Sequence, residues 1–193
     1  MIVLLNGSFG VGKSTVAGLL RKRLKGSMIY DPEWTGSVLQ RLPQWLNLKG
    51  SRTDDFQDLD AWRRCAVSGT KLFQRIASAP VIVPMTFSRH DYFDEITAGI
   101  RRFDPALNIF CLHASLGTIE KRLAHRGSSG EWLSRRVKEC VAAHRDPRFG
   151  TRVDTEGRSA REVANDLFGR LQSGIMDAHH DQHQPVIHRG HGA

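Results

Sequence analysis

Residues 1–14 read MIVLLNGSFGVGKS, and this stretch decides the fold of the chain. The first five residues are all apolar, which predicts a buried strand of a parallel sheet. Gly7–Ser14 follows directly and fits the pattern G-x-x-x-x-G-K-[ST] at every fixed position. Residues 15–24 then have apolar side chains at helical spacing. A glycine loop between a strand and a helix predicts a phosphate-binding loop rather than a chance turn.

The residue types in this loop explain the ligand it would hold. Glycines allow the backbone to wrap a phosphate with its N–H groups pointing inward, and the helix N-terminus adds its positive dipole end. Lys13 would reach the β- and γ-phosphates, while Ser14 would ligate Mg²⁺. We therefore expect ATP and Mg²⁺ as cofactors. The residues expected to contact the nucleotide are Gly7, Ser8, Phe9, Gly10, Val11, Gly12, Lys13, Ser14 and Thr15.

Length and composition predict one α/β domain. The chain has 193 residues, of which 40% are hydrophobic and 25% charged, as in ordinary globular proteins. We expect no secretion signal, because the first expected strand begins directly at the N-terminus. We also expect no stable membrane insertion, because no apolar run approaches the roughly 20 residues that span a bilayer. The three cysteines show no C-x-x-C spacing, which predicts free thiols and a cytoplasmic protein. Weak association with a membrane surface and the oligomeric state stay open.

The formal net charge of +8 comes mostly from residues 121–148, which hold eight basic and three acidic side chains. One interpretation is a nucleic-acid footprint. However, aromatic residues are not interleaved with the basic ones, as they are in proteins that bind single strands. We therefore favour a basic lid over a polyphosphate and expect no nucleic-acid partner.

Along the chain, expected strands and helices alternate. Further strands are expected at residues 27–30, 80–85, 107–112 and 151–153. Helices are expected at 34–46 (broken at Pro43), from Asp54 or Asp55 onward, at 92–102, at 115–126, after a glycine hinge at 127–130, and from Ser159, which forms a capping box with Glu162. This order predicts a three-layer P-loop NTPase fold: a five-stranded parallel sheet with helices on both faces and a lid. We expect a domain at 1–175 with its lid at about 122–148, and a polar, His-rich, disordered tail at 176–193.

The ends of the expected strands carry the candidate catalytic groups, since ligands bind beyond the carboxyl ends of parallel strands. Asp31 closes the second strand and is the candidate for taking a proton from an acceptor hydroxyl, although an N-cap role is an alternative. Many phosphate-loop enzymes have an acid after the third strand, but here that position reads Met85-Thr86-Phe87. Thr86 would contact the substrate or a metal-bound water, with structural capping as the alternative.

Basic and aromatic residues complete the predicted site. Arg122, Arg126 and Arg135 flank the glycine hinge, a layout that would close arginines over the transferring phosphate; a solvated basic surface is the alternative. Substrate contacts are expected from Trp62, Arg63 and Arg89, with Arg64 and His90 as weaker candidates. Asp54 and Asp55 are interpreted as a helix start rather than as part of a site.

Several segments together resemble the tunicamycin-resistance protein family of bacterial ATP-binding proteins. The matching segments are Asn6-Gly7-x-Phe9-Gly10-x-Gly12-Lys13, Tyr30-Asp31-Pro32-Glu33, Asp55-Phe56-Gln57 with Trp62-Arg63, Val83-Pro84-Met85-Thr86 with Tyr92-Phe93, Ala114-Ser115 with Thr118, and Arg122-Leu123-x-x-Arg126. The resemblance runs from Met1 to about Leu171. It implies a fold like that of nucleoside-monophosphate kinases, related to chloramphenicol phosphotransferase. It also implies ATP binding at residues 7–14 and a role in resistance to tunicamycin, a nucleoside antibiotic.

These observations lead to one preferred function and two alternatives. We expect an ATP-dependent kinase that acts on a hydroxyl of tunicamycin or a similar nucleoside, a small-molecule substrate. One alternative is a protein that sequesters the drug and binds ATP as a structural ligand. The other is a metabolic nucleoside or nucleotide kinase.

Overall fold

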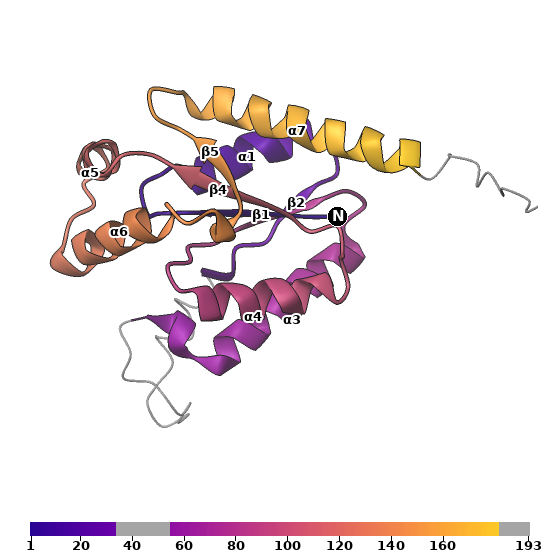
Figure 1. Ribbon diagram of the computed structural model, residues 1–193, viewed down its shortest axis with the longest axis horizontal. Helices are drawn as coiled ribbons and strands as arrows, with labels where there is room; N and C mark the ends of the chain where they lie inside the picture. Colours follow the sequence, from indigo (N-terminus) through magenta and orange to yellow (C-terminus); the bar gives the residue numbers. More distant parts are fainter. Residues whose placement is uncertain (34–54, 182–193) are drawn as a thin grey trace, which may run out of the picture.

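The computed structural model describes residues 1–33 and 55–181, in which five parallel strands form one sheet of order β2–β3–β1–β4–β5 (Figure 1). The strands are β1 (Ile2–Gly7), β2 (Met28–Ile29), β3 (Val81–Pro84), β4 (Asn108–His113) and β5 (Thr151–Asp154). β1 lies in the middle, paired in parallel with β3 on one side and β4 on the other. The expected parallel α/β sheet is therefore confirmed.

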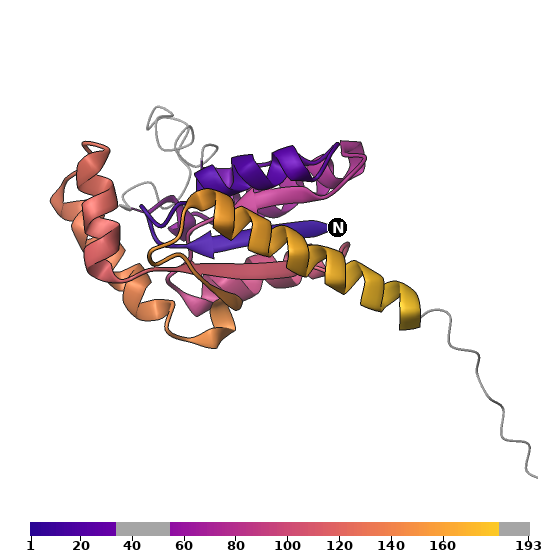
Figure 2. The same cartoon turned by 90° about the horizontal axis from the view of Figure 1, so that it is seen from above.

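Helices cover both faces of the sheet (Figures 1 and 2). α1 (Lys13–Arg23) and α7 (Ala160–Asp181) lie side by side on one face, while α3 (Asp60–Ile76) and α4 (His90–Arg101) cover the other. The alternation of β1 divides the core, because Val3 and Leu5 pack toward α1 whereas Ile2 and Leu4 pack toward α3 and α4. Burial on both faces explains why residues 2–5 are all apolar.

Two further helices lie beyond the carboxyl end of β1, away from the two main helical layers (Figure 2). These are α5 (Leu116–His125) and α6 (Glu131–Ala143). Gly127 and Gly130 in their connection have φ of 67° and 139°, a backbone region that glycine adopts readily. Two short 3-10 turns, η2 (Phe56–Asp58) and η3 (Pro147–Phe149), complete the described elements.

Some expected boundaries differ from those in the structure. The helix expected from Asp54 or Asp55 begins at Asp60, because residues 56–58 form η2 first. α7 continues to Asp181, so the expected domain boundary at residue 175 falls inside a helix. The helix expected at 34–46 and residues 182–193 of the expected tail lie outside the described residues.

The capping box before α7 is confirmed. The Ser159 hydroxyl accepts from Glu162 N at 3.3 Å, and the Glu162 carboxylate accepts from Ser159 N at 2.7 Å. Among the described residues, no helix is both long and apolar enough to cross a membrane.

Candidate active site

The phosphate loop joins β1 to α1, as predicted. Gly10 and Gly12 have φ of 77° and 109°, values that residues with a Cβ rarely adopt. A Cβ at Gly10 would also lie 2.7 Å from the side chain of Leu123 on α5. Lys13 is buried, and its Nζ donates to Gly7 O at 2.9 Å and to Ser8 O at 3.2 Å. The loop therefore holds the lysine ammonium at its centre.

An aromatic contact connects the loop to α6. The Phe9 and Trp132 rings meet edge to face with centroids 5.6 Å apart. The Lys13 ammonium lies 5.6 Å from the centroid of the same Phe9 ring. Phe9 thus lies between Lys13 of the loop and Trp132 of α6.

Asp31 follows β2 and caps the next turn. Its Oδ1 accepts from Glu33 N at 3.0 Å, the N-cap contact that the sequence left as an alternative role. Trp62 is fully buried on α3, and its Nε1 donates to Pro32 O at 2.9 Å. Trp62 thus holds the backbone between the two acids of this turn, and its expected contact with a substrate stays a prediction.

Glu33 is a site residue that the sequence analysis missed. Its carboxylate lies beside Lys13 and Thr86, and burial raises its pKa although Lys13 opposes this effect. The sequence shows Glu33 only as a second acid two residues after Asp31. Its place in the site follows from the fold, because Thr86, which follows β3, lies next to it.

Thr86 lies where β3 ends and is fully buried. The Gln57 amide of η2 donates to Thr86 O, and Asn6 Oδ1 accepts from Phe87 N at 2.9 Å. We call the region around Asp31, Glu33 and Thr86 the acceptor side, because it adjoins Lys13 and carries the carboxylates.

His144, at the C-terminal end of α6, also holds this segment. Its Nε2 lies 2.6 Å from Phe87 O, and burial lowers the pKa of His144 from 6.5 to about 4. The unfolded chain therefore binds a proton between these two pH values that the folded chain does not bind.

We expect the free energy of unfolding to be highest above pH 6.5 and to fall by about 3 kcal/mol through His144 as the pH drops to about 4. Urea titrations across this range would measure the loss. His144→Gln should remove most of it, whereas the same change at the exposed His125 should not. An equal pH dependence in wild type and His144→Gln would contradict the assignment.

Two arginines expected to bind substrate are engaged by carboxylates. Arg63 Nε bonds Glu95 of α4 at 2.7 Å, and its two other nitrogens bond Gln57 O and Asp60. Arg89 forms a two-point contact with Asp91, with distances of 3.1 and 2.6 Å. Their direct contact with a substrate stays a prediction.

Arg122 lies on α5 and contacts the phosphate loop directly. Its guanidinium donates to Val11 O at 3.1 Å and to Thr155 O at 2.8 Å, which ties the loop to the turn after β5. A cavity of about 380 Å³ opens here, a volume suited to a nucleotide base. Its lining includes Val11, Gly12, Thr15, Arg122, Arg126 and Thr155.

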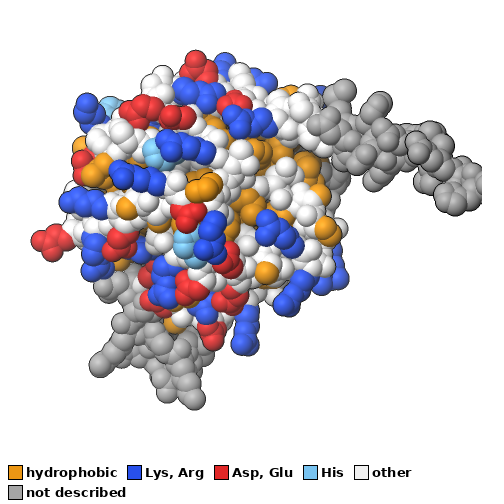
Figure 3. Space-filling view, in the orientation of Figure 1, with side chains coloured by type: hydrophobic (Ala, Val, Ile, Leu, Met, Phe, Trp, Pro, Cys, Tyr) orange, Lys and Arg blue, Asp and Glu red, His pale blue; other side chains and the backbone are white. Residues whose placement is uncertain are grey.

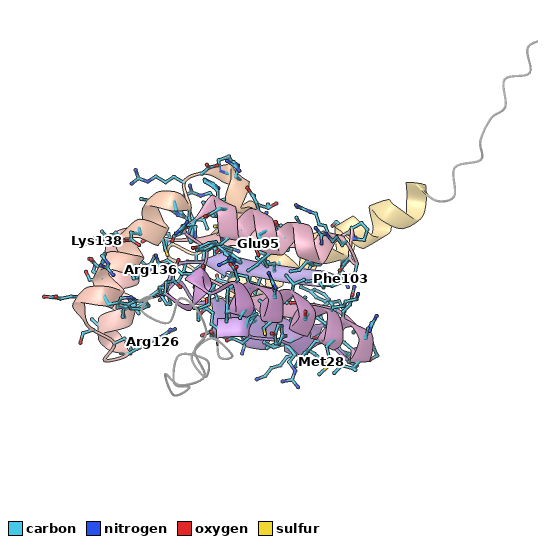
Figure 4. All side chains as sticks on the ribbon, turned by 90° about the horizontal axis from the view of Figure 1, so that it is seen from below. Met28, Glu95, Phe103, Arg126, Arg136 and Lys138 are labelled. Atoms are coloured by element: carbon cyan, nitrogen blue, oxygen red, sulfur yellow. The ribbon has the colours of Figure 1, made fainter. Side chains whose placement is uncertain are left out.

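On α6 two neighbouring arginines, the predicted Arg135 and Arg136, differ in exposure. The Arg135 side chain is 58% exposed and lies 3.9 Å from Glu139. Arg136, labelled in Figure 4, is 11% exposed, and it bonds Asp55 at 2.7 Å. Burial raises the pKa of Asp55, and Arg136 opposes this effect. Phosphate contacts by Arg122, Arg126 and Arg135 stay predictions.

The residues of the loop fit Mg²⁺ held together with nucleotide phosphates. Ser14 lies in the first turn of α1 and is exposed, so its hydroxyl is accessible beside the loop. Among the described residues, no group of three or more His, Cys, Asp or Glu side chains forms a metal cage. A hydroxyl plus phosphate oxygens and waters is the usual environment of Mg²⁺ at such loops.

A family model described as AAA domain matches residues 2–147. The chain belongs to this AAA domain family. As an AAA domain it has the loop, the parallel sheet and the strand order on which nucleotide sites of this class are built. No protein of curated function matches the chain.

Solved structures show the same fold. The tunicamycin resistance protein of Deinococcus radiodurans has 25% identity and a TM-score of 0.70, with 89% of this chain and 95% of that chain covered. A gluconokinase from Sinorhizobium meliloti has 19% identity and a TM-score of 0.65, with coverage of 94% and 97%. Shikimate kinase from Acinetobacter baumannii has 14% identity and a TM-score of 0.58, with coverage of 90% and 93%. The resemblance to the tunicamycin-resistance family is thus confirmed for this AAA domain.

Proposed function

We propose that this chain is an ATP-dependent phosphotransferase that acts on a hydroxyl of tunicamycin or a similar nucleoside. The observation that carries the proposal is that the Glu33 carboxylate lies beside both Lys13 and Thr86, so that a carboxylate adjoins the lysine expected to bind phosphate. Phosphoryl transfer needs little more than positioned phosphates, neutralised charge and a group that takes the hydroxyl proton.

The roles follow from the geometry. Loop amides and Lys13 bind the phosphates, Ser14 holds Mg²⁺, and the cavity beside Arg122 takes the base. Bound Mg²⁺ supplies charge neutralisation and orients the phosphates. Glu33 is favoured over Asp31 as the proton acceptor, because its carboxylate lies beside Lys13 and Thr86 and burial raises its pKa, which makes it the stronger base. Asp31 holds the turn through Glu33 N.

The test is mass spectrometry of tunicamycin after incubation with the full chain, ATP and Mg²⁺. The proposal expects one added phosphate group on the drug. Unchanged drug that nevertheless raises the melting temperature would refute the kinase function, because a ligand that binds only the folded state stabilises it.

Sequestration is the second candidate, and one observation favours it. The segment after β3 carries Thr86 where many phosphate-loop enzymes have an acid. A sequestering protein should still protect cells from tunicamycin when Glu33 is replaced by Gln. A kinase with this substitution should not.

A further inference from the structure

Arginines close to the acceptor side are neutralised by carboxylates in the described part of the chain. Arg63 pairs with Glu95 at 2.7 Å, and Arg89 pairs with Asp91 at 2.6 Å. On the molecular face in Figure 3, acidic and basic side chains are likewise interspersed. The third such arginine, Arg136, differs because it lies on the helix that touches the phosphate loop.

Arg136 shares one face of α6 with two residues that face the site. Trp132, one turn earlier, contacts Phe9 of the loop, and Cys140, one turn later, is fully buried. Burial raises the pKa of the Cys140 thiol to about 11, while Arg136 and Lys13 both oppose this effect. Arg136 therefore lies one helical turn from a thiol whose pKa is raised by burial and lowered in part by the charge of Lys13. Figure 4 labels Arg136 together with Lys138, whose side chain is exposed on the same helix.

The charge of Arg136 is balanced mainly from within the protein. Asp55 lies 2.7 Å away and its side chain is 18% exposed, whereas the second partner, Glu139, is 45% exposed. Solvent screens the Glu139 pair more strongly. Arg136 Nε is buried and has no hydrogen-bond acceptor among the described residues. The guanidinium thus keeps an unused donor, but Asp55 removes its attraction for an anion.

We propose that Asp55 determines acceptor specificity by neutralising Arg136, so that the acceptor side takes uncharged hydroxyl compounds and rejects anionic ones. This inference rests on the proposed function, since it names the acceptor class of the same site. A phosphate or carboxylate on the acceptor would have to displace Asp55 or lie beside it, and two negative charges at short range repel. Rejection of a competitor through a like charge is a common source of specificity.

The experiment compares uridine with uridine 5′-monophosphate, which differ by one charged group. Calorimetry with the full chain, Mg²⁺ and a non-hydrolysable ATP analogue measures both affinities while the phosphate loop is filled. Wild type should bind uridine more tightly. Asp55→Asn should shift the affinity ratio toward the monophosphate by about tenfold or more, because Arg136 then keeps only its half-exposed partner Glu139 and can form charge-assisted bonds to phosphate.

Asp94→Asn is the matched control. It removes the same charge from the exposed pair that Asp94 of α4 forms with Arg148 of η3, and should leave the ratio unchanged. If Asp55→Asn weakens both ligands equally, Asp55 only ties α6 to the segment before α3 and the proposal is wrong. Wild type that prefers the monophosphate, or binds neither compound, also overturns it.

The two proposals fail in different ways. Phosphate transfer to tunicamycin with an unchanged affinity ratio in Asp55→Asn would sustain the kinase and refute the role of Asp55. A shifted ratio without any phosphate transfer would sustain the role of Asp55 in ligand selection and refute the kinase.

Discussion

Replacing Lys13 with methionine is expected to lower kcat for phosphoryl transfer about a thousandfold. The Lys13 ammonium is the buried cation at the centre of the loop, 2.9 Å from Gly7 O. In the transition state it would neutralise charge on the transferred phosphate, and one such preorganised contact contributes roughly 10²–10³ or more to rate. Methionine keeps the length of the side chain and removes the charge.

Steady-state ADP release with tunicamycin as acceptor measures this effect. Lys22→Met is the matched control, because Lys22 lies on the exposed end of the same helix and should leave kcat unchanged. The melting temperature should also stop responding to ATP in Lys13→Met. If Lys13→Met retains activity within about tenfold of wild type, the loop does not act as the phosphate site of a kinase.

Replacing Glu33 with glutamine should lower kcat about a hundredfold or more, the usual contribution of a general base. It should also remove the acidic limb of the pH–rate profile. The base must be ionised to take the hydroxyl proton, so the wild-type rate falls as the pH drops through its pKa. Burial raises the pKa of Glu33, which places this limb at higher pH than for an ordinary glutamate.

Asp31→Asn distinguishes the two acids of the turn. If Asp31 were the base, its substitution and not that of Glu33 would abolish the acidic limb. Measuring the free energy of unfolding of Glu33→Gln distinguishes loss of the general base from loss of folding. A carboxyl group whose pKa is raised on folding destabilises the folded state increasingly as the pH rises past its unfolded value, so Glu33→Gln should be at least as stable as wild type at neutral pH. A loss of activity accompanied by loss of folding would leave Glu33 without a catalytic role.

Most of the sheet and of the phosphate loop could be predicted from the sequence because their determinants are local. The pattern Gly7–Ser14 and the apolar run before it belong to one short segment, and the expected strand at 80–85 is also an apolar run, whereas the one at 151–153 has only Val153 as an apolar residue. The capping box of α7 is equally local. The start of α3 was not predicted correctly, since residues 56–58 form a 3-10 turn that propensity does not distinguish from a first helical turn.

The sequence by itself determined the fold, the phosphate loop and the ATP-binding character of this chain. Only the tertiary structure decided which side chains meet. Glu33 became a site residue because parallel strands bring the ends of β2 and β3 together, and Trp62 became a support because its indole reaches Pro32 O. Likewise, Arg136 faces the site and Arg135 faces solvent because adjacent helical positions point about 100° apart, and packing of α6 on the loop selects one of them. Ion pairs between distant segments, such as Asp55 with Arg136, depend on how the chain folds back on itself. The spacing of residues along the sequence does not predict such pairs.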